Sequence, residues 1–139
     1  MSNYSQIKSF TKNMGSAGGQ IQLGYIEPID NDSMFGYLNN VVVTALINEG
    51  DGDNGGMLFY LSSNSSWNDS DVLAAKGIPG YGGSVSLSAK RKVTGQVEHN
   101  RPDGRVYIYG ECTDLTVTTD VSVRIVLEAW GRFITLVEA

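Results

Sequence analysis

The chain has one cysteine, one histidine, three prolines and no long hydrophobic run. Cys112 has no second cysteine to pair with, which excludes a disulfide within the chain. No apolar stretch approaches the ~18 residues that span a membrane, and the N-terminus lacks the apolar core of a signal peptide. His99 stands alone, so the sequence shows neither a zinc ligand set nor a catalytic triad. We therefore expect no membrane segment, no cofactor and no enzymatic activity.

Positive charge is scarce as well. Ten Lys and Arg residues stand against 15 Asp and Glu residues, which gives a formal net charge of −5. Nucleic-acid binding needs lysines and arginines that displace counterions from the phosphates. The densest basic stretch, residues 90–92, is more typical of a solvated strand or a subunit contact. The composition thus predicts no direct binding to nucleic acid.

What the sequence does contain is a series of short runs in which apolar and polar residues alternate. The clearest are residues 85–89, 106–109 and 121–127, and Gly, Asn and Asp separate them. A period of two places the apolar side chains on one face of a strand and the polar ones on the other. With roughly eight or nine such runs, the chain is expected to form an all-β antiparallel sandwich of one domain.

The first 20 residues differ from the rest, because they are polar and end in a glycine-rich stretch. We expect a flexible N-terminal arm with a Gly-rich joint over residues 1–20, followed by a β-sandwich domain over residues 21–139. Within the arm, Ile7, Phe10 and Met14 recur at helical spacing. Two interpretations are open: a short helix that docks on this domain or on a neighbour, and a frayed terminus.

The aromatic residues are the best candidates for binding. Tyr107 and Tyr109 alternate with the two apolar residues of their strand, so they stand together on an outer surface if those residues face the core. Either a neighbouring subunit covers them or they form an ordinary cross-strand pair. Trp67 in a polar loop and Tyr81 in a glycine-rich one are candidate platforms for a sugar ring. Trp130 is expected in the core.

The turn over residues 48–56 carries Asp51 and Asp53 and has the oxygen-rich composition that calcium prefers. An EF-hand is excluded, because the twelfth position counted from Asp51 is Ser62 and not a glutamate. A solvated hairpin turn without metal is the default interpretation. A calcium site of another kind, with Asp51 and Asp53 as ligands, stays open.

The order of features resembles that of single jelly-roll virion proteins, meaning capsid subunits and the small β-sandwich proteins that decorate capsids. The features are a polar N-terminal segment with a glycine joint, about eight strands, long loops in the first half and a long strand over residues 121–130. The resemblance implies a jelly-roll-like sandwich that assembles in the host cytoplasm into a virion, with its own copies and other virion proteins as partners. The interface residues it implies are Ile7, Phe10, Met14, Tyr107 and Tyr109.

Three points limit this hypothesis. The arm offers only Lys8 and Lys12, whereas the arms of coat proteins that package RNA are strongly basic, so protein–protein contact is expected to dominate over genome binding. The alternative hypothesis is a carbohydrate-binding module or a lectin-like fibre tip that uses Trp67 and Tyr81. Alternation does not specify which strands pair, so a jelly roll and another Greek-key sandwich are both open.

Overall fold

The alternating runs form strands in the computed structural model, which describes residues 3–14, 19–29, 35–48, 56–94, 104–113 and 119–139. Within these residues there are nine strands and one turn of 3-10 helix. Their bounds are β1 (Asn3–Met14), β2 (Ile21–Pro28), β3 (Phe35–Ile47), β4 (Met57–Ser62), η1 (Asp69–Asp71), β5 (Val72–Ile78), β6 (Gly82–Thr94), β7 (Val106–Cys112), β8 (Thr119–Trp130) and β9 (Ile134–Glu138).

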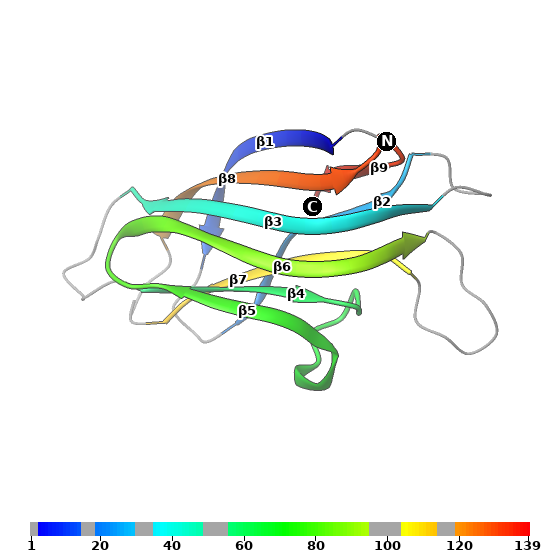
Figure 1. The fold of residues 1–139 in the computed structure, drawn as a ribbon. Helices are drawn as coiled ribbons and strands as arrows, with labels where there is room; N and C mark the ends of the chain where they lie inside the picture. Colours follow the sequence, from blue (N-terminus) through cyan, green and yellow to red (C-terminus); the bar gives the residue numbers. More distant parts are fainter. Residues whose placement is uncertain (1–2, 15–18, 30–34, 49–55, 95–103, 114–118) are drawn as a thin grey trace.

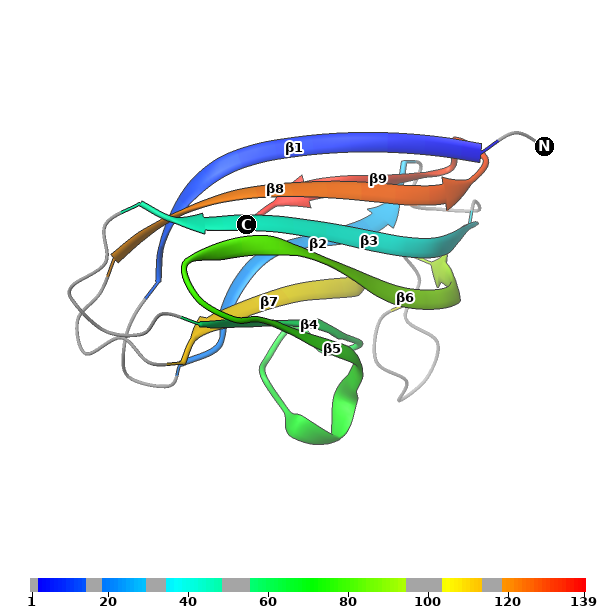
Figure 2. The same cartoon turned by 60° about the vertical axis from the view of Figure 1, so that its left-hand side comes forward.

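The strands form two antiparallel sheets that pack face to face (Figures 1 and 2). The four-stranded sheet has the order β1-β8-β3-β6, and the five-stranded sheet has the order β5-β4-β7-β2-β9. Among the first eight strands, β1 pairs with β8, β2 with β7, β3 with β6 and β4 with β5. A long hairpin that wraps into two sheets produces this pairing, which is the jelly roll. The predicted all-β sandwich is confirmed, and the strand order is that of a jelly roll with β9 added beside β2.

The core lies between the two sheets and contains the inward positions of the alternating runs. Every second residue of β8 from Val121 to Ala129 is buried. Burying one large apolar side chain contributes about 1.5–3 kcal/mol relative to leaving it exposed, so this layer is the main source of stability. The largest fully buried side chains are Phe59, Met14, Leu23, Ile26, Leu38, Met57, Leu61, Leu87, Ile108, Ile125, Leu127 and Ile134.

A β-bulge interrupts the pairing of β3 with β6. Between the pairs Leu38–Arg91 and Asn40–Ser88, β6 contains one residue more than β3, and Lys90 has a φ of 45°. The register between β3 and β8 shifts at the same place. The bulge reverses the alternation of β3, so that two core residues on either side of it are three positions apart instead of two.

The N-terminal segment differs from expectation. Of the predicted arm (residues 1–20), residues 3–14 form β1, which pairs with β8 without a break in register. The predicted helix or frayed end over Ile7, Phe10 and Met14 is therefore wrong. The glycine joint at residues 15–18 lies outside the described residues. The alternation of β1 is obscured because β1 is an edge strand, where inward positions near the rim of the sandwich are polar.

One such rim residue links the two sheets. Gln6 of β1 accepts two hydrogen bonds through Oε1, one from the backbone N–H of Leu136 at 2.7 Å and one from the hydroxyl of Thr135 at 3.1 Å. Both donors belong to β9, the edge strand of the other sheet. Gln6 thereby satisfies a backbone group that an edge strand would otherwise leave without a protein partner.

Candidate interaction surfaces

The outer face of the five-stranded sheet carries a cluster of tyrosines. Tyr60 of β4 is directly opposite Tyr109 of β7, and Tyr107 of β7 is opposite Tyr25 of β2, with 5.9 Å between the latter two ring centroids. The β4–β5 connection, residues 63–71, lies against this cluster. It ends in η1, which Asn68 caps by accepting a hydrogen bond from the backbone N–H of Ser70 at 3.0 Å.

Trp67 of this connection packs between two of the tyrosines. Its ring centroid is 4.8 Å from that of Tyr60 and 5.3 Å from that of Tyr109, and both contacts are edge-to-face. Its indole N–H donates to the carboxylate of Asp69 at 3.0 Å. The Tyr109 hydroxyl donates to the backbone carbonyl of Asn64 at 2.9 Å, which holds the start of the connection. Trp67 therefore closes an aromatic cluster within the chain.

A polar network borders the cluster. Glu111 accepts a hydrogen bond from the Tyr60 hydroxyl through Oε1 and one from Gln20 Nε2 through Oε2, the latter at 3.3 Å. Burial raises the pKa of Tyr60, and the hydrogen bond to Glu111 and its charge raise this pKa further. Burial also raises the pKa of Tyr109. Both hydroxyls thus stay protonated at neutral pH and act as hydrogen-bond donors.

The prediction for Tyr107 and Tyr109 is correct in one part and wrong in another. Both side chains belong to the outer side of the sheet, but their exposed fractions are only 3% and 2%. The cover comes from the chain's own residues, Trp67 and Asn64 for Tyr109 and the Tyr25 ring for Tyr107. They are therefore not exposed interface residues. Sequence spacing missed this because the covering loop lies more than 35 positions away.

The outer face of the four-stranded sheet is different, because large apolar side chains there are exposed. Ile7 is 53% exposed, Leu46 54%, Tyr37 42% and Trp130 45%. Tyr37 and Trp130 are directly opposite each other on β3 and β8. Trp130, predicted in the core, is thus on the surface, because its neighbour Ala129 takes the inward position. A neighbouring molecule would remove these side chains from water.

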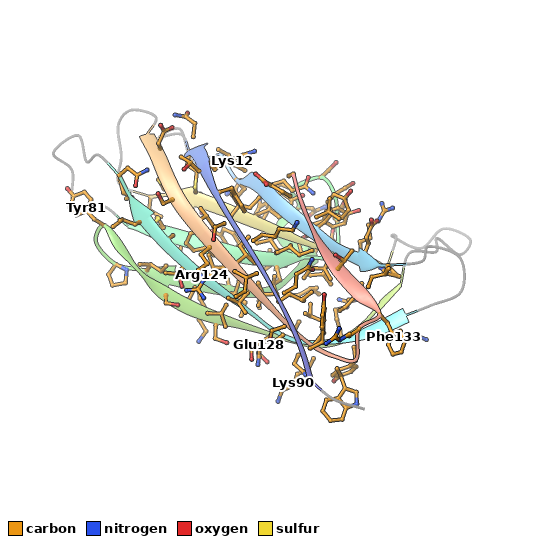
Figure 3. All side chains as sticks on the ribbon, turned by 90° about the horizontal axis from the view of Figure 1, so that it is seen from above. Lys12, Tyr81, Lys90, Arg124, Glu128 and Phe133 are labelled. Carbon is orange, nitrogen blue, oxygen red and sulfur yellow. The ribbon has the colours of Figure 1, made fainter. Side chains whose placement is uncertain are left out.

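Two opposite charges lie on the same outer face. Arg124 and Glu128 are both on β8, and Figure 3 shows them along this strand on the upper surface. Within the part of the chain that the structure describes, neither makes a hydrogen bond or an ion pair. Alternation in the sequence places both side chains on the wet face of their strand, so the sequence alone indicates that they lie on the surface.

An open hollow lies on this face beside Arg124. Its volume is about 460 Å³, and strands β1, β8 and β3 line it. Hydroxyl groups border it, and the Thr44 hydroxyl is hydrogen-bonded to that of Ser84 at 2.9 Å. The exposed Leu46 forms part of its wall. The lining residues are Ser9, Phe10, Thr11, Thr44, Ala45, Leu46, Ser122, Val123 and Arg124.

The remaining predicted site residues are dispersed. Ile7 is exposed on the outer face, and Phe10 is half-buried and contributes to the hollow. Met14 is fully buried in the core, so its assignment as an interface anchor is wrong. Tyr81 is 40% exposed at the β5–β6 end, and its backbone carbonyl accepts from Ile47 N–H at 2.7 Å.

Neither a metal-binding group nor a reactive thiol is found among the described residues. They contain no group of three or more His, Cys, Asp and Glu side chains that could hold a metal ion. Asp51, Asp53 and His99 lie outside the described residues. Cys112 is buried in the core, and burial raises the pKa of its thiol, with a further contribution from the charge of Glu111. A helix long and apolar enough to cross a bilayer is not found in the described parts of the chain.

The fold is similar to that of chains in solved virus structures. A chain of a virus-like particle of the nodavirus of the prawn Macrobrachium rosenbergii is 7% identical, with 99% of this chain and 96% of that chain covered and a TM-score of 0.46. A nora virus chain is 8% identical, with 97% and 57% covered and a TM-score of 0.49. A chain of empty cowpea mosaic virus particles is 11% identical, with 98% and 87% covered and a TM-score of 0.48. No protein-family model matches the sequence, and no curated protein matches it.

Proposed function

We propose that this chain is a virion structural protein, either a capsid subunit or a decoration protein, that acts through self-assembly and contacts with other virion proteins. The observation that carries the proposal is the set of large apolar side chains exposed on the outer face of the four-stranded sheet. A jelly roll is used by capsid proteins, lectin domains and cupins, so the fold alone does not choose among these roles. The exposed apolar surface favours a capsid protein over a lectin domain or a cupin.

The interior and the second outer face support the same choice. The space between the sheets is filled by large apolar side chains such as Phe59, Leu87 and Ile125, which favours a scaffold over a ligand-holding barrel. Trp67, one of the two candidate sugar platforms, makes edge-to-face contacts with two tyrosines of this chain, and its N–H donates to Asp69. Of the two rings that the carbohydrate-binding alternative names, only Tyr81 is largely exposed, at 40%.

The proposal extends to location and partners. The protein is placed in the virion after assembly in the host cytoplasm, as a homo-oligomer in contact with other virion proteins and without catalytic activity. With a net charge of −5, its surface is repelled by nucleic-acid phosphates, so its contacts are with protein.

Sedimentation velocity of the purified full chain, together with electron microscopy for particles, tests the proposal. We expect oligomers whose size grows with concentration. Leu46→Lys places a charge on the exposed apolar face and should weaken this association, whereas Leu73→Lys, an exposed leucine on β5 of the other sheet, is the matched control. A wild-type chain that stays monomeric from micromolar to millimolar concentration overturns self-assembly.

A further inference from the structure

The outer face of the four-stranded sheet has an apolar row of residues at its centre. Outward positions on β8 recur every second residue, and Val126 is the middle one of the five from Ser122 to Trp130. Strand pairing places Ile7 of β1 and Val42 of β3 in the same row as Val126. An apolar row therefore crosses three strands at the centre of the face.

The charges flank this apolar row at equal distances. Arg124 lies two residues before Val126 on β8, and Glu128 lies two residues after it. Both side chains are on the outer face, and within the described residues neither has a charged partner of its own. One charge of each sign, placed on either side of an apolar centre, is the pattern that two copies of one surface need to complement each other.

The shape of the face is complementary on the two sides of this row. Four residues before Val126, the row of Ser122 contains the exposed Leu46 and borders the hollow. Four residues after it, the row of Trp130 contains Tyr37, and both aromatic side chains are exposed. The bulge in β3 is what brings Tyr37 outward into this row, because it shifts the register between β3 and β8 by one residue. A hollow thus lies on one side of the centre, and two exposed aromatic side chains lie on the other.

We propose that a second copy of this chain docks face to face on this sheet, about a two-fold axis that crosses the strands at the Val126 row. This inference rests on the proposed self-assembly and specifies its geometry. With β8 antiparallel to β8 of the partner subunit, Arg124 meets Glu128 of the partner subunit, and Glu128 meets Arg124 of the partner subunit. The central apolar row meets its own copy, and the hollow receives Trp130 of the partner subunit.

The size of the face is compatible with a specific contact. Four strands spaced by about 4.8 Å, and eight residue steps of about 3.4 Å, give roughly 500 Å² of flat area per copy. The total of about 1,000 Å² is where specific interfaces begin. Twisted sheets stack within about 30° of each other, so β8 and its copy stay nearly aligned across the rows that carry the charges.

Charge reversal tests the two-fold arrangement. Arg124→Glu would place two glutamates of one chain against two of the partner, and Glu128→Arg would place two arginines against two. Each single variant should self-associate at least about tenfold more weakly than wild type in sedimentation experiments. The double variant R124E/E128R should regain association, and so should an equimolar mixture of the two single variants, because every contact then joins opposite charges. Lys76→Glu, which lies on the other sheet and changes the net charge by the same amount as Arg124→Glu, should have no effect.

The outcomes separate this inference from the proposed function. Both residues are exposed or half-buried and unpaired in the described structure, so the variants should keep the wild-type circular dichroism spectrum and melting curve. If the wild type associates and neither single variant associates more weakly, the proposed docking face is wrong, but the proposed self-assembly is not contradicted. If both single variants are weaker but neither the mixture nor the double variant recovers, the two-fold pairing is overturned. A wild type that never associates overturns the proposed function itself.

Discussion

The ring of Trp67 meets the ring of Tyr109 edge-to-face, at an interplanar angle of 71° and with 5.3 Å between centroids. A loop tryptophan and a strand tyrosine 42 positions apart thus close one aromatic cluster, and the tyrosine is buried as a result. The contact makes the β4–β5 connection part of the folded unit. It also means that the two tryptophans of this chain have different roles.

The two tryptophans should respond differently to truncation. Trp67→Ala removes edge contacts with two tyrosines and the hydrogen bond to Asp69, and should lower the free energy of unfolding by about 2–3 kcal/mol. Trp130→Ala removes an exposed side chain and should change it by less than about 0.5 kcal/mol. Urea unfolding of both variants at a concentration where the chain is monomeric measures this. Equal losses of unfolding free energy in the two variants would contradict the conclusion that only Trp67 has a structural role.

The residues of β1 should divide by strand alternation rather than by helical spacing. Met14 is fully buried and Ile7 is exposed. Met14→Ala should therefore cost about 2–4 kcal/mol of stability by leaving a cavity in the core, while Ile7→Ala should cost less than about 0.5 kcal/mol. Ile7→Ala should instead reduce self-association. Chemical denaturation and sedimentation of the same two variants separate these effects, and a large stability loss in Ile7→Ala would refute the strand.

Gly36 of β3 provides space for Ile134 of β9 where the two sheets meet. A Cβ added at Gly36 would clash with Cγ2 of Ile134 and would lie 3.1 Å from its Cγ1 and 3.2 Å from its Cβ. Gly36→Ala should destabilise the protein by about 1–3 kcal/mol through overpacking. Gly19→Ala, where no heavy atom lies within 4 Å, is the control and should cost nothing.

A double-mutant cycle identifies the source of the Gly36 effect. Ile134→Ala removes the two nearest of the three Ile134 atoms that crowd the new Cβ, and only its own Cβ at 3.2 Å stays. Its cost and that of Gly36→Ala should therefore add to more than the cost of the double variant, by about 1 kcal/mol. Thermal or urea unfolding of the four proteins gives the coupling free energy. Strict additivity would mean that the two side chains do not compete for the same space.

Stability should fall at alkaline pH partly because of Tyr60. Its pKa in the folded protein is raised by burial and by Glu111, whereas in the unfolded chain it is near the ordinary value of about 10. Below that value both states are protonated and the stabilisation is fully present; above it the unfolded state loses its proton first, so stability is lost as pH rises. The free energy of unfolding should begin to decline near pH 10 and should keep declining as the pH rises towards the raised pKa of Tyr60 in the folded protein.

Tyr60→Phe is the variant that checks the assignment. It removes the ionisable hydroxyl, so the alkaline decline should be shallower than in wild type, whereas Tyr37→Phe, which alters an exposed tyrosine, should leave it unchanged. Urea unfolding at several alkaline pH values measures the slope. Identical slopes for wild type and Tyr60→Phe would show that the hydroxyl keeps an ordinary affinity for its proton.

Much of the candidate surface could be predicted from the sequence, because alternation along a strand indicates which residues lie on each of its two faces. Alternation along residues 121–127 correctly places Arg124 on the wet side, opposite a dry side that includes Ile125. The same rule places Tyr107 and Tyr109 on the outer side of their sheet. It fails for β1, where Phe10 and Met14 suggested a helix, because an edge strand has only a partly buried inner face and its remaining inward positions are polar.

By itself, the sequence determined an all-β sandwich, the dry and wet sides of its long strands and an acidic balance of charge, because these are local properties of a period of two and of composition. The tertiary structure decided which strands pair, that β1 belongs to the four-stranded sheet and that Trp67 covers Tyr109. It also decided that Tyr37, Trp130, Leu46 and Arg124 share one surface. Such contacts join residues many positions apart, and only the folded backbone brings them into register.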